Sequence, residues 1–282
     1  MGDVRGAGRG GERSGPPVLL TIAGSDSGGG AGIQADLKTF AALGGYGTSA
    51  ITAVTAQNPA GVSAIQGIEP AIVSAQIRQV ARYYPLAAAK TGMLFSAAVV
   101  RAVAEAWSEL SPRPPLVVDP VLAATSGAKL LAEDALTALC ERILPLATIV
   151  TPNMEEAALL LGQPLRGRTD LEPAARALYA RFGLAVLVKG GHLQDSAEAA
   201  DCLFDGRSVA WSVRPFVRGV NSHGTGCTLS AAIAAGLGAG LPLPEAVERA
   251  RTYLHAGLLA AVQVGPDKAI NHAHGPVAVP GS

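Results

Sequence analysis

The 282-residue sequence predicts an α/β fold with a doubly wound, mainly parallel sheet, helices on both faces in three layers, and a small antiparallel edge. Two observations predict it. Short runs that are apolar throughout, and often β-branched, recur along the chain, as is typical of parallel strands buried on both faces. Helical patterns separate these runs, and such alternation favours a parallel sheet with right-handed crossovers.

The strands predicted from the apolar runs are Val18–Ala23, Ser49–Thr55, Ala87–Lys90, Leu116–Asp119, Thr148–Thr151 and Ala185–Lys189. The helices predicted between and after them are Ile33–Leu43, Ala71–Arg82, Ser96–Leu110, Glu133–Leu144, Asn153–Leu161, Leu171–Phe182, Cys227–Ala239 and Pro244–Val264. Pro70 and Ser96 suit helix starts. Asp205-Gly206, between Cys202–Phe204 and Ser208–Val213, predicts a hairpin and therefore the antiparallel edge.

Composition excludes several classes of protein. Hydrophobic residues make up 49% of the chain, enough for a large core, so disorder is excluded. A net charge of +0 argues against a nucleic-acid binder held by a basic surface. The three scattered cysteines form no disulfide framework or zinc pattern, and a cytoplasmic protein is expected.

Two segments need separate treatment. Residues 1–16 are expected to be a flexible tail and residues 17–282 a single domain; a signal peptide is the alternative, with Val18–Ala23 at the short limit for its apolar part. Val220–Pro244 lacks charged side chains. Its apolar part, Leu229–Leu241, is too short and glycine-rich to span a membrane, so a buried helix is expected.

Ligands of such folds bind at the carboxyl ends of the strands, where this chain carries two glycine-rich loops. The first, Gly24–Gly32, fits neither the dinucleotide fingerprint nor a P-loop. Its glycines would let the backbone approach a ligand closely, although a loose turn is the alternative.

The second loop, His223–Thr228, opens an apolar helix. Backbone amides and the helix dipole favour an anion there, such as a phosphate in transfer. Cys227 lies in the first turn, where a lowered thiol pKa would allow a thiolate base. A buried, inert cysteine is the alternative.

Polar side chains follow four other predicted strands. Asn153 can cap the next helix, while Glu155 and Glu156 suit either its dipole or a Mg²⁺ site. Lys189 is either an exposed lysine or a point charge for phosphate, and Asp119 offers a carboxylate in a similar place. Gln57-Asn58 provides amides that a small heterocycle could use. These residues together predict a small-molecule phosphotransferase.

The motifs, taken in order over Val18–Pro276, resemble the hydroxymethylpyrimidine/phosphomethylpyrimidine kinases of thiamine biosynthesis, within the ribokinase-like superfamily. The matching segments are Thr21–Asp26, Gly28–Gly32, Ile33–Asp36, Thr52–Asn58, Lys90–Leu94, Asp119–Val121, Thr151–Asn153, Val188–His192 and His223–Thr228. The chain departs from the family pattern in two places. Ser27-Gly28 replaces Pro-Ser, and Ser222 replaces Thr; neither change is expected to touch a proposed contact.

The resemblance implies a role for each matching residue. Gln57 would hydrogen-bond the pyrimidine, in a pocket lined by Gly24, Asp36, Met93 and Val121. The transferred phosphoryl group would lie in an anion hole formed by Gly224, Thr225 and Gly226, with Cys227 as the base. Lys189, Asn153 and Thr225 would contact ATP. Glu156 is associated with Mg²⁺, and Asp119 would assist there.

The implied activity is ATP-dependent phosphorylation of 4-amino-5-hydroxymethyl-2-methylpyrimidine and then of its monophosphate. Pyridoxal kinase is the alternative within the branch, because some of these kinases also carry Cys at the position of Cys227. A non-catalytic small-molecule sensor is the alternative from another class. The resemblance also implies a homodimer. A lid excluding water is expected, with Ala124–Leu131 and Gly190–Ala200 as candidates.

Overall fold

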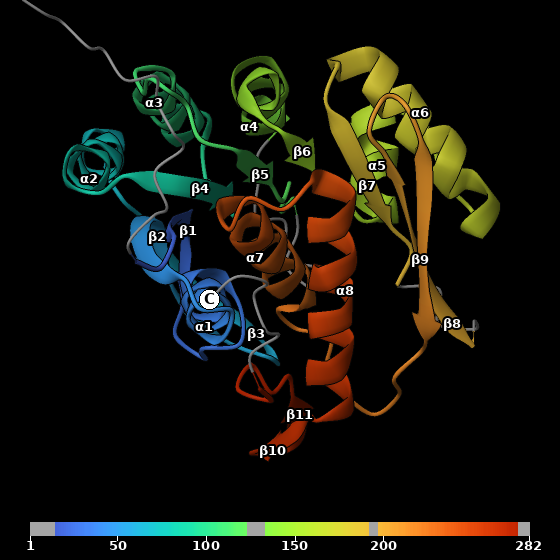
Figure 1. The fold of residues 1–282 in the computed structure, drawn as a ribbon. Coiled ribbons are helices and arrows are strands. Elements are labelled where there is room, and N and C mark those ends of the chain that lie inside the picture. The colour runs from blue at the N-terminus through green and yellow to red at the C-terminus, as the bar shows by residue number, and fades with distance from the viewer. Residues whose placement is uncertain (1–14, 123–132, 192–196, 276–282) are drawn as a thin grey trace, which may run out of the picture.

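One nine-stranded sheet forms the centre of the structure, a computed structural model that describes residues 15–122, 133–191 and 197–275. The strands lie in the order β3-β2-β1-β4-β5-β6-β7-β8-β9 (Figure 1). They are β1 (Val18–Asp26), β2 (Tyr46–Asn58), β3 (Gly61–Gly67), β4 (Leu86–Thr91), β5 (Leu116–Val118), β6 (Ile149–Val150), β7 (Ala185–Lys189), β8 (Glu198–Phe204) and β9 (Val209–Pro215).

The central strands β2, β1, β4, β5, β6 and β7 pair in parallel, which confirms the strands predicted from the apolar runs. The predicted hairpin is also confirmed, because β8 pairs antiparallel with both β7 and β9. The sequence analysis missed β3, which pairs antiparallel with β2 at the other edge. Most side chains of β3 are exposed, so it lacks the apolar run by which the buried strands were found.

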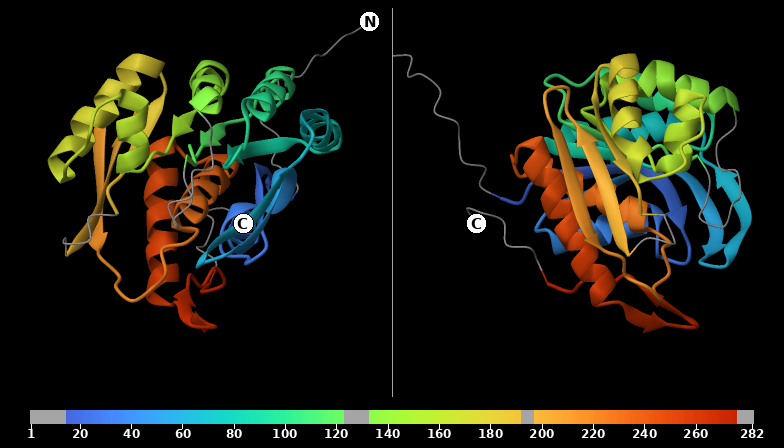
Figure 2. Two further views of the ribbon diagram at one scale, coloured as in Figure 1. Left: turned by 180° about the vertical axis from the view of Figure 1, so that it is seen from behind. Right: turned by 90° about the vertical axis from the view of Figure 1, so that its right-hand side faces the viewer.

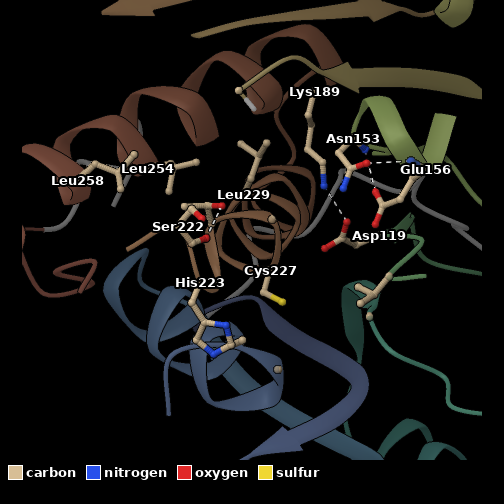
Figure 3. A pocket seen from close by; sticks show the side chains of 18 of the residues that line it. Asp119, Asn153, Glu156, Lys189, Ser222, His223, Cys227, Leu229, Leu254 and Leu258 are labelled. Carbon is tan, nitrogen blue, oxygen red and sulfur yellow. Dashed lines mark hydrogen bonds and ion pairs between the residues drawn. The ribbon is translucent and has the colours of Figure 1, made fainter. Parts of the chain in front are cut away.

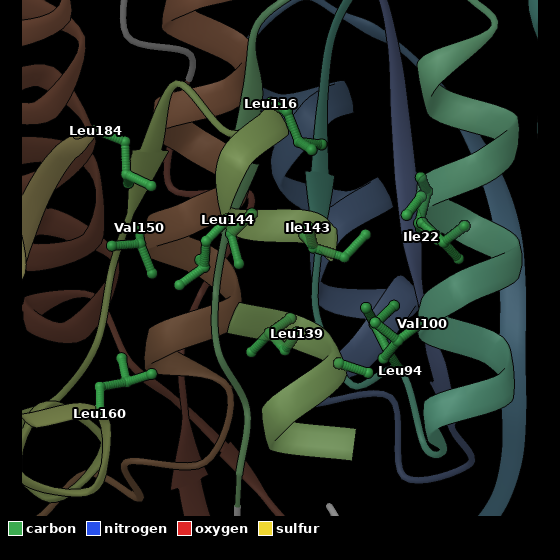
Figure 4. Packing of buried hydrophobic residues seen from close by; sticks show 14 of the residues in the cluster. Ile22, Leu94, Val100, Leu116, Leu139, Ile143, Leu144, Val150, Leu160 and Leu184 are labelled. Atoms are coloured by element: carbon green, nitrogen blue, oxygen red, sulfur yellow. The ribbon is translucent and has the colours of Figure 1, made fainter. Parts of the chain in front are cut away.

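Helices cover both faces of the sheet, giving the predicted three layers (Figures 1 and 2). One face carries α2 (Pro70–Tyr83), α3 (Ala97–Ser108), α4 (Glu133–Ala138), α5 (Met154–Leu161) and α6 (Leu171–Phe182). The other face carries α1 (Gly32–Ala42), α7 (Thr225–Gly238) and α8 (Leu243–Leu259). The buried residues of each face form a separate hydrophobic cluster, and Figure 4 shows part of the first.

Local signals account for several helix ends. Pro70 is the first residue of α2, where its missing N–H costs no hydrogen bond. The Ser96 side chain accepts a hydrogen bond from the amide of Val99 and caps α3. Gly162 and Gly183 end α5 and α6 at φ 72° and 70°, left-handed conformations that favour glycine.

Two predicted helices were too long. The segment predicted as Glu133–Leu144 leaves α-helical geometry at Ala138 and continues as a π-helical turn, Leu139–Ile143, and a 3₁₀ turn. The last helix ends at Leu259 instead of Val264. The residues beyond it form a small hairpin of β10 (Val262–Val264) and β11 (Asp267–Ala269), in which Gly265 adopts φ 60°.

The predicted buried helix in Val220–Pro244 is α7, most of whose side chains are inaccessible to solvent. Within residues 15–122, 133–191 and 197–275, no helix is long and apolar enough to cross a bilayer. The order of strands reverses at β1, since the chain runs from β1 to β2 on one side and reaches β4 on the other. Such a reversal opens a crevice at the carboxyl ends of β1 and β4, where the predicted site residues lie.

Candidate active site

A cavity of about 840 Å³ lies at the carboxyl ends of the parallel strands. Its walls come from the last residues of β1, β2 and β7, the segments that follow β4, β5 and β6, the chain between β9 and α7, the start of α7, and α8. Of the residues predicted to form the site, those lining it are Gly24, Gln57, Met93, Asp119, Val121, Asn153, Glu156, Lys189, Gly224, Thr225, Gly226 and Cys227. Asp36 is the exception: its side chain is completely buried and is not part of the cavity wall.

Lys189 and Asp119 form an ion pair at the edge of the cavity. Lys189, the last residue of β7, donates from Nζ to Asp119 Oδ1 over 3.0 Å. Burial acts to lower the pKa of Lys189, but Asp119 and Glu156 outweigh it and hold this pKa above its usual range. Only 12% of the lysine side chain is accessible, so the alternative of an exposed lysine is wrong.

Asn153 and Glu156 form a capping box at the start of α5. The amide of Asn153 donates to Glu156 Oε2 over 2.7 Å, and the amide of Glu156 donates to Asn153 Oδ1 over 2.8 Å. Burial raises the pKa of Glu156 to about 7; nearby Asp119 also raises it, and Lys189 acts in the opposite direction. Glu156 therefore closes the helix end and also holds a carboxyl group that changes protonation near neutral pH.

The carboxyl groups of Asp119 and Glu156 are suited to hold a magnesium ion. The charge on Asp119 opposes ionisation of Glu156, and a divalent cation would reduce this repulsion. Mg²⁺ is typically held by one or two carboxylates plus water and substrate phosphates. Among the residues that the structure describes, no group of three or more His, Cys, Asp or Glu side chains is close enough to hold a metal alone. The donor set suits an ion that keeps most of its ligands from water and nucleotide.

The first turn of α7 forms the predicted anion site. Gly224 precedes it at φ 81°, and a Cβ there would overlap the carbonyl oxygen of Gly30 in the first glycine-rich loop. A Cβ at Gly226 would lie 3.2 Å from Lys189 Nζ. Glycine is thus required at position 224, and at position 226 it leaves close room for the lysine of the ion pair.

Cys227 projects from the same turn, between His223 and the Lys189–Asp119 pair in Figure 3. The expected lowering of its thiol pKa is wrong, because burial raises the pKa of Cys227 to about 11. Asp36 and Asp119 also raise this pKa, whereas Lys90 and a hydrogen bond from the Gly32 amide lower it. Desolvation here outweighs the helix N-terminus, so the free enzyme carries a thiol at neutral pH.

Asp26 and His223 are site residues that the sequence analysis missed. Asp26 accepts hydrogen bonds from the amides of Gly28, Gly30 and Ala31, and its Oδ2 lies 2.9 Å from His223 Nε2. One buried carboxylate thereby organises the first glycine-rich loop and joins it to the second. The alternative of a loose turn is wrong for this loop, and the available signal was an acidic residue at the end of an apolar strand.

The substrate end of the cavity has its own close contacts. The Met93 side chain packs against Gly24, where a Cβ would overlap the methionine methyl group. Thr55 Oγ1 shares its proton between the Ser25 carbonyl oxygen at 2.8 Å and Gln57 Oε1 at 3.0 Å, and the second contact helps to orient the Gln57 side chain. Ser27 Oγ donates to the main-chain carbonyl oxygen of Gln57 over 2.8 Å and accepts a hydrogen bond from the main-chain N–H of the same residue. Ser27 thus contacts the backbone of Gln57 and not the side-chain amide that is predicted to bind the substrate.

The opposite wall was also missed. Leu254 and Leu258 of α8 reach the cavity beside Leu229 of α7 (Figure 3). The sequence predicted both helices but assigned none of these three leucines to the site. Arg251 Nε lies 3.0 Å from Asp201 Oδ2, which ties α8 to β8. Of the two candidate lids, Ala124–Leu131 lies outside the described residues, and so does the 192–196 part of Gly190–Ala200.

Comparison with known proteins agrees with this geometry. The family model described as phosphomethylpyrimidine kinase matches residues 26–278. A hydroxymethylpyrimidine/phosphomethylpyrimidine kinase from Rhizobium meliloti is 49% identical over 261 residues, which cover 91% of this chain and 97% of the relative.

Solved structures share the ribokinase-like fold. A phosphomethylpyrimidine kinase from Clostridium difficile 630 has a TM-score of 0.74 and 40% identity, covering 85% of this chain and 98% of its own. An ADP complex of Bacillus subtilis pyridoxal kinase has a TM-score of 0.84 and 32% identity, covering 92% and 98%. With its motifs in one cavity and the family model matching nearly its whole length, the chain belongs to the phosphomethylpyrimidine kinase family.

Proposed function

We propose that this enzyme transfers the terminal phosphoryl group of ATP to 4-amino-5-hydroxymethyl-2-methylpyrimidine, and then phosphorylates the resulting monophosphate to the diphosphate. One observation carries the proposal. A single cavity holds two carboxyl groups suited to Mg²⁺, a lysine, a glycine-lined helix N-terminus and a cysteine. Phosphoryl transfer depends mainly on positioning and charge stabilisation, and these groups supply both.

The pyrimidine would bind beside the packed pair Gly24 and Met93, with its ring edge toward Gln57. The Gln57 side chain can donate to a ring nitrogen and accept from an exocyclic amine, the pattern that an aminopyrimidine presents. The hydrogen bond from Thr55 to Oε1 limits rotation of this amide. The substrate hydroxymethyl group would then point toward Cys227.

The nucleotide would occupy the other half of the cavity. Leu229, Leu254 and Leu258 form an apolar wall against which a purine ring can lie (Figure 3). The phosphates would extend toward Lys189 and the first turn of α7. Mg²⁺, held by Glu156 and Asp119 through water, would neutralise phosphate charge.

Proton transfer is assigned to Cys227. As the substrate oxygen bonds to phosphorus and the bond to ADP breaks, the hydroxyl proton passes to the Cys227 sulfur. The group that accepts it is the thiolate, a minor species at neutral pH because the pKa of Cys227 is about 11. Lys189 and the amides of Gly226 and Cys227 would stabilise the charge of the transferring group.

ATP consumption tests the substrate assignment when the pyrimidine alcohol, its monophosphate and pyridoxal are compared side by side. Turnover is expected with the first two at a higher kcat/KM than with pyridoxal. A preference for pyridoxal would overturn the assignment, and no turnover with any of them would favour the sensor function.

Vitamin B6 phosphorylation is the second candidate, favoured by the TM-scores of 0.83 and 0.84 with pyridoxal kinases of Staphylococcus aureus and Bacillus subtilis. A pyridine shares the ring shape of a pyrimidine, so the same pocket can hold it. Gln57→Leu separates the two, because it should weaken the aminopyrimidine more than pyridoxal. The homodimer implied by the family resemblance stays a prediction, for which sedimentation equilibrium is the test.

A further inference from the structure

A charged pair, Lys90 and Asp36, lies buried behind the cavity, and Lys90 has been given no role so far. Lys90 of β4 and Thr21 of β1 are opposite each other in the parallel ladder. Lys90 Nζ donates to Asp36 Oδ1 over 2.9 Å, and Thr21 Oγ1 donates to Asp36 Oδ2 over 2.6 Å. The side chains of Lys90 and Asp36 are both 0% exposed.

Stability alone does not explain this pair. Removing two charges from water costs more free energy than their attraction returns in many proteins, and apolar replacements of such pairs are often neutral or stabilising. Asp36 nevertheless keeps the lysine charged: burial acts to lower the pKa of Lys90, and the carboxylate outweighs it and raises this pKa above its usual range. A permanent positive charge is therefore held inside the sheet.

The ammonium group lies directly behind the cavity wall. A Cβ at Gly92 would be 3.3 Å from Lys90 Nζ and 3.0 Å from the Cβ of Ala23, and both Gly92 and Ala23 line the cavity. The Cys227 sulfur in the first turn of α7 lies near this point, because it accepts a hydrogen bond from the Gly32 amide, one helical turn before Asp36 on α1. Glycine at position 92 leaves only a thin wall between the ammonium group and the site.

Charges from several elements act on the Cys227 sulfur. Lys90 on β4 favours the thiolate, as does the hydrogen bond from the Gly32 amide at the start of α1. Asp36 on α1 and Asp119 after β5 oppose it, the latter already paired with Lys189 at the end of β7. Among these groups Lys90 has the largest favourable influence, and it exceeds that of its own partner Asp36.

We propose that Lys90 is a positioning residue for phosphoryl transfer: its buried ammonium group, held by Asp36 and Thr21, stabilises negative charge on the Cys227 sulfur when the substrate proton is taken up. The inference rests on the proposed function in assigning Cys227 as the proton acceptor. The proposal gives a reason for a buried lysine in the sheet behind the cavity wall that Cys227 faces.

Titration of the thiol tests the proposal without any substrate. In a Cys140→Ser/Cys202→Ala background, Cys227 is the only thiol, and its alkylation by iodoacetamide is followed from pH 7 to 11. The variant Lys90→Met/Asp36→Asn removes both charges with little change of volume. Because Lys90 favours the thiolate more than Asp36 opposes it, the alkylation rate at pH 8 is expected to fall about threefold, corresponding to a midpoint about half a unit higher.

Thr21→Val is the matched control, since it removes a hydrogen bond to Asp36 and leaves both charges. It should leave the alkylation midpoint of Cys227 unchanged. Lys90→Met/Asp36→Leu, an apolar pair, provides a second variant if the first is unstable in thermal unfolding. An unchanged midpoint in either folded variant overturns the proposal and leaves Lys90 a purely structural residue.

Kinetics supply the second readout. In Lys90→Met/Asp36→Asn, kcat at pH 8 is expected to fall in parallel with the alkylation rate, with KM for ATP unchanged. A fall in kcat at all pH values, without a change in the alkylation midpoint, would show a packing defect and refute the electrostatic role. A wrong substrate assignment would not alter the alkylation result, so the two proposals fail separately.

Discussion

At Cys227, burial and local charge act in opposite directions. A helix N-terminus, the Gly32 amide and Lys90 favour a thiolate, while desolvation and two carboxylates favour the thiol, and the pKa of about 11 shows that the second set prevails. Cys227 therefore stays a protonated thiol at neutral pH in the absence of substrate. The thiolate takes up the substrate hydroxyl proton only as the substrate oxygen forms its bond to phosphorus.

Cys227→Ala tests this role. Loss of a general base typically lowers turnover by about 100- to 10,000-fold, and the variant should show a fall of this size in kcat with little change in KM for ATP. Steady-state kinetics at saturating pyrimidine provide the measurement. Cys140→Ala, at a half-buried cysteine outside the cavity wall, is the control. Undiminished turnover in Cys227→Ala would mean that the thiol is not the base.

Glu156 should make magnesium use depend on pH. Because burial raises its pKa to about 7, the carboxyl group is protonated below pH 7 and ionised above it. The Mg²⁺ concentration needed for half-maximal rate should therefore rise as pH falls from 8 to 6. In Glu156→Gln this dependence should disappear, while the exposed neighbour in Glu155→Gln should retain it. Equal pH profiles in all three enzymes would exclude Glu156 from the metal site.

The same carboxyl group predicts a stability change of known sign. Its pKa in the folded state lies above the usual value of 4.5, so the folded state binds the proton more tightly. Folding stability from this group is therefore full in acid and is lost as pH rises from about 4.5 to 7. Glu156→Gln, which keeps an acceptor for the Asn153 amide, should raise the melting temperature at pH 8 and change it little at pH 4.

At the scale of elements, α7 depends on how its first turn meets the β1–α1 loop. Gly224 has a positive φ and directly touches Gly30, so it is restricted both by conformation and by space. Gly240, just after the same helix, has φ 88°, and a Cβ added there would meet no atom within 4 Å. The two glycines therefore share one kind of strain and differ in their surroundings.

Gly224→Ala and Gly240→Ala separate these effects. Both should lose about 1 kcal/mol of unfolding free energy from the left-handed conformation. Only Gly224→Ala should also displace the anion site, with a fall in kcat of about 100-fold or more, comparable to loss of an oxyanion-hole donor. Urea unfolding and steady-state kinetics on both proteins measure the two quantities. Equal kcat values would show that the loop contact does not position the site.

At the scale of the whole molecule, the site depends on contacts between distant parts of the chain. Asp26 and His223 are 197 positions apart, and their contact joins the end of the first strand to the loop before α7. Lys90 and Asp36 are 54 positions apart and join β4 to α1. Both contacts join segments far apart in the sequence, so the site exists only in the folded sheet with its helices in place.

Asp26→Asn should weaken the fold in a pH-dependent way. Burial acts to raise the pKa of Asp26, but hydrogen bonds from His223 and two backbone amides outweigh it and lower this pKa. Its stabilisation is therefore present above the usual value of 3.8 and is lost as pH falls through the lower, folded-state value. Urea unfolding at pH 7 should show a loss of about 1–3 kcal/mol, and the loss at pH 3 should be smaller. A loss of equal size at both pH values would assign the effect to packing.

Much of the fold follows from local pattern. Buried parallel strands must be apolar on both faces, and helices between them must present one apolar stripe, so both leave a periodicity that a single sequence displays. Edge strands such as β3 leave no such signal, because one or both of their faces meet water. The predicted end of the last helix lay too far along the chain, because the residues after Leu259 pair as β10 and β11, a contact that their local pattern does not record.

The motifs were enough to indicate which residues face the cavity, because each motif lies at the end of a strand and the carboxyl ends of parallel strands meet at one edge of the sheet. The chemical state of those residues depends instead on the folded arrangement. Burial sets the protonation of Cys227 and Glu156, and packing of β1, β4 and α1 places the Lys90 charge behind the thiol. Desolvation and charge coupling depend on distances between residues far apart in the chain, and no local pattern records those distances.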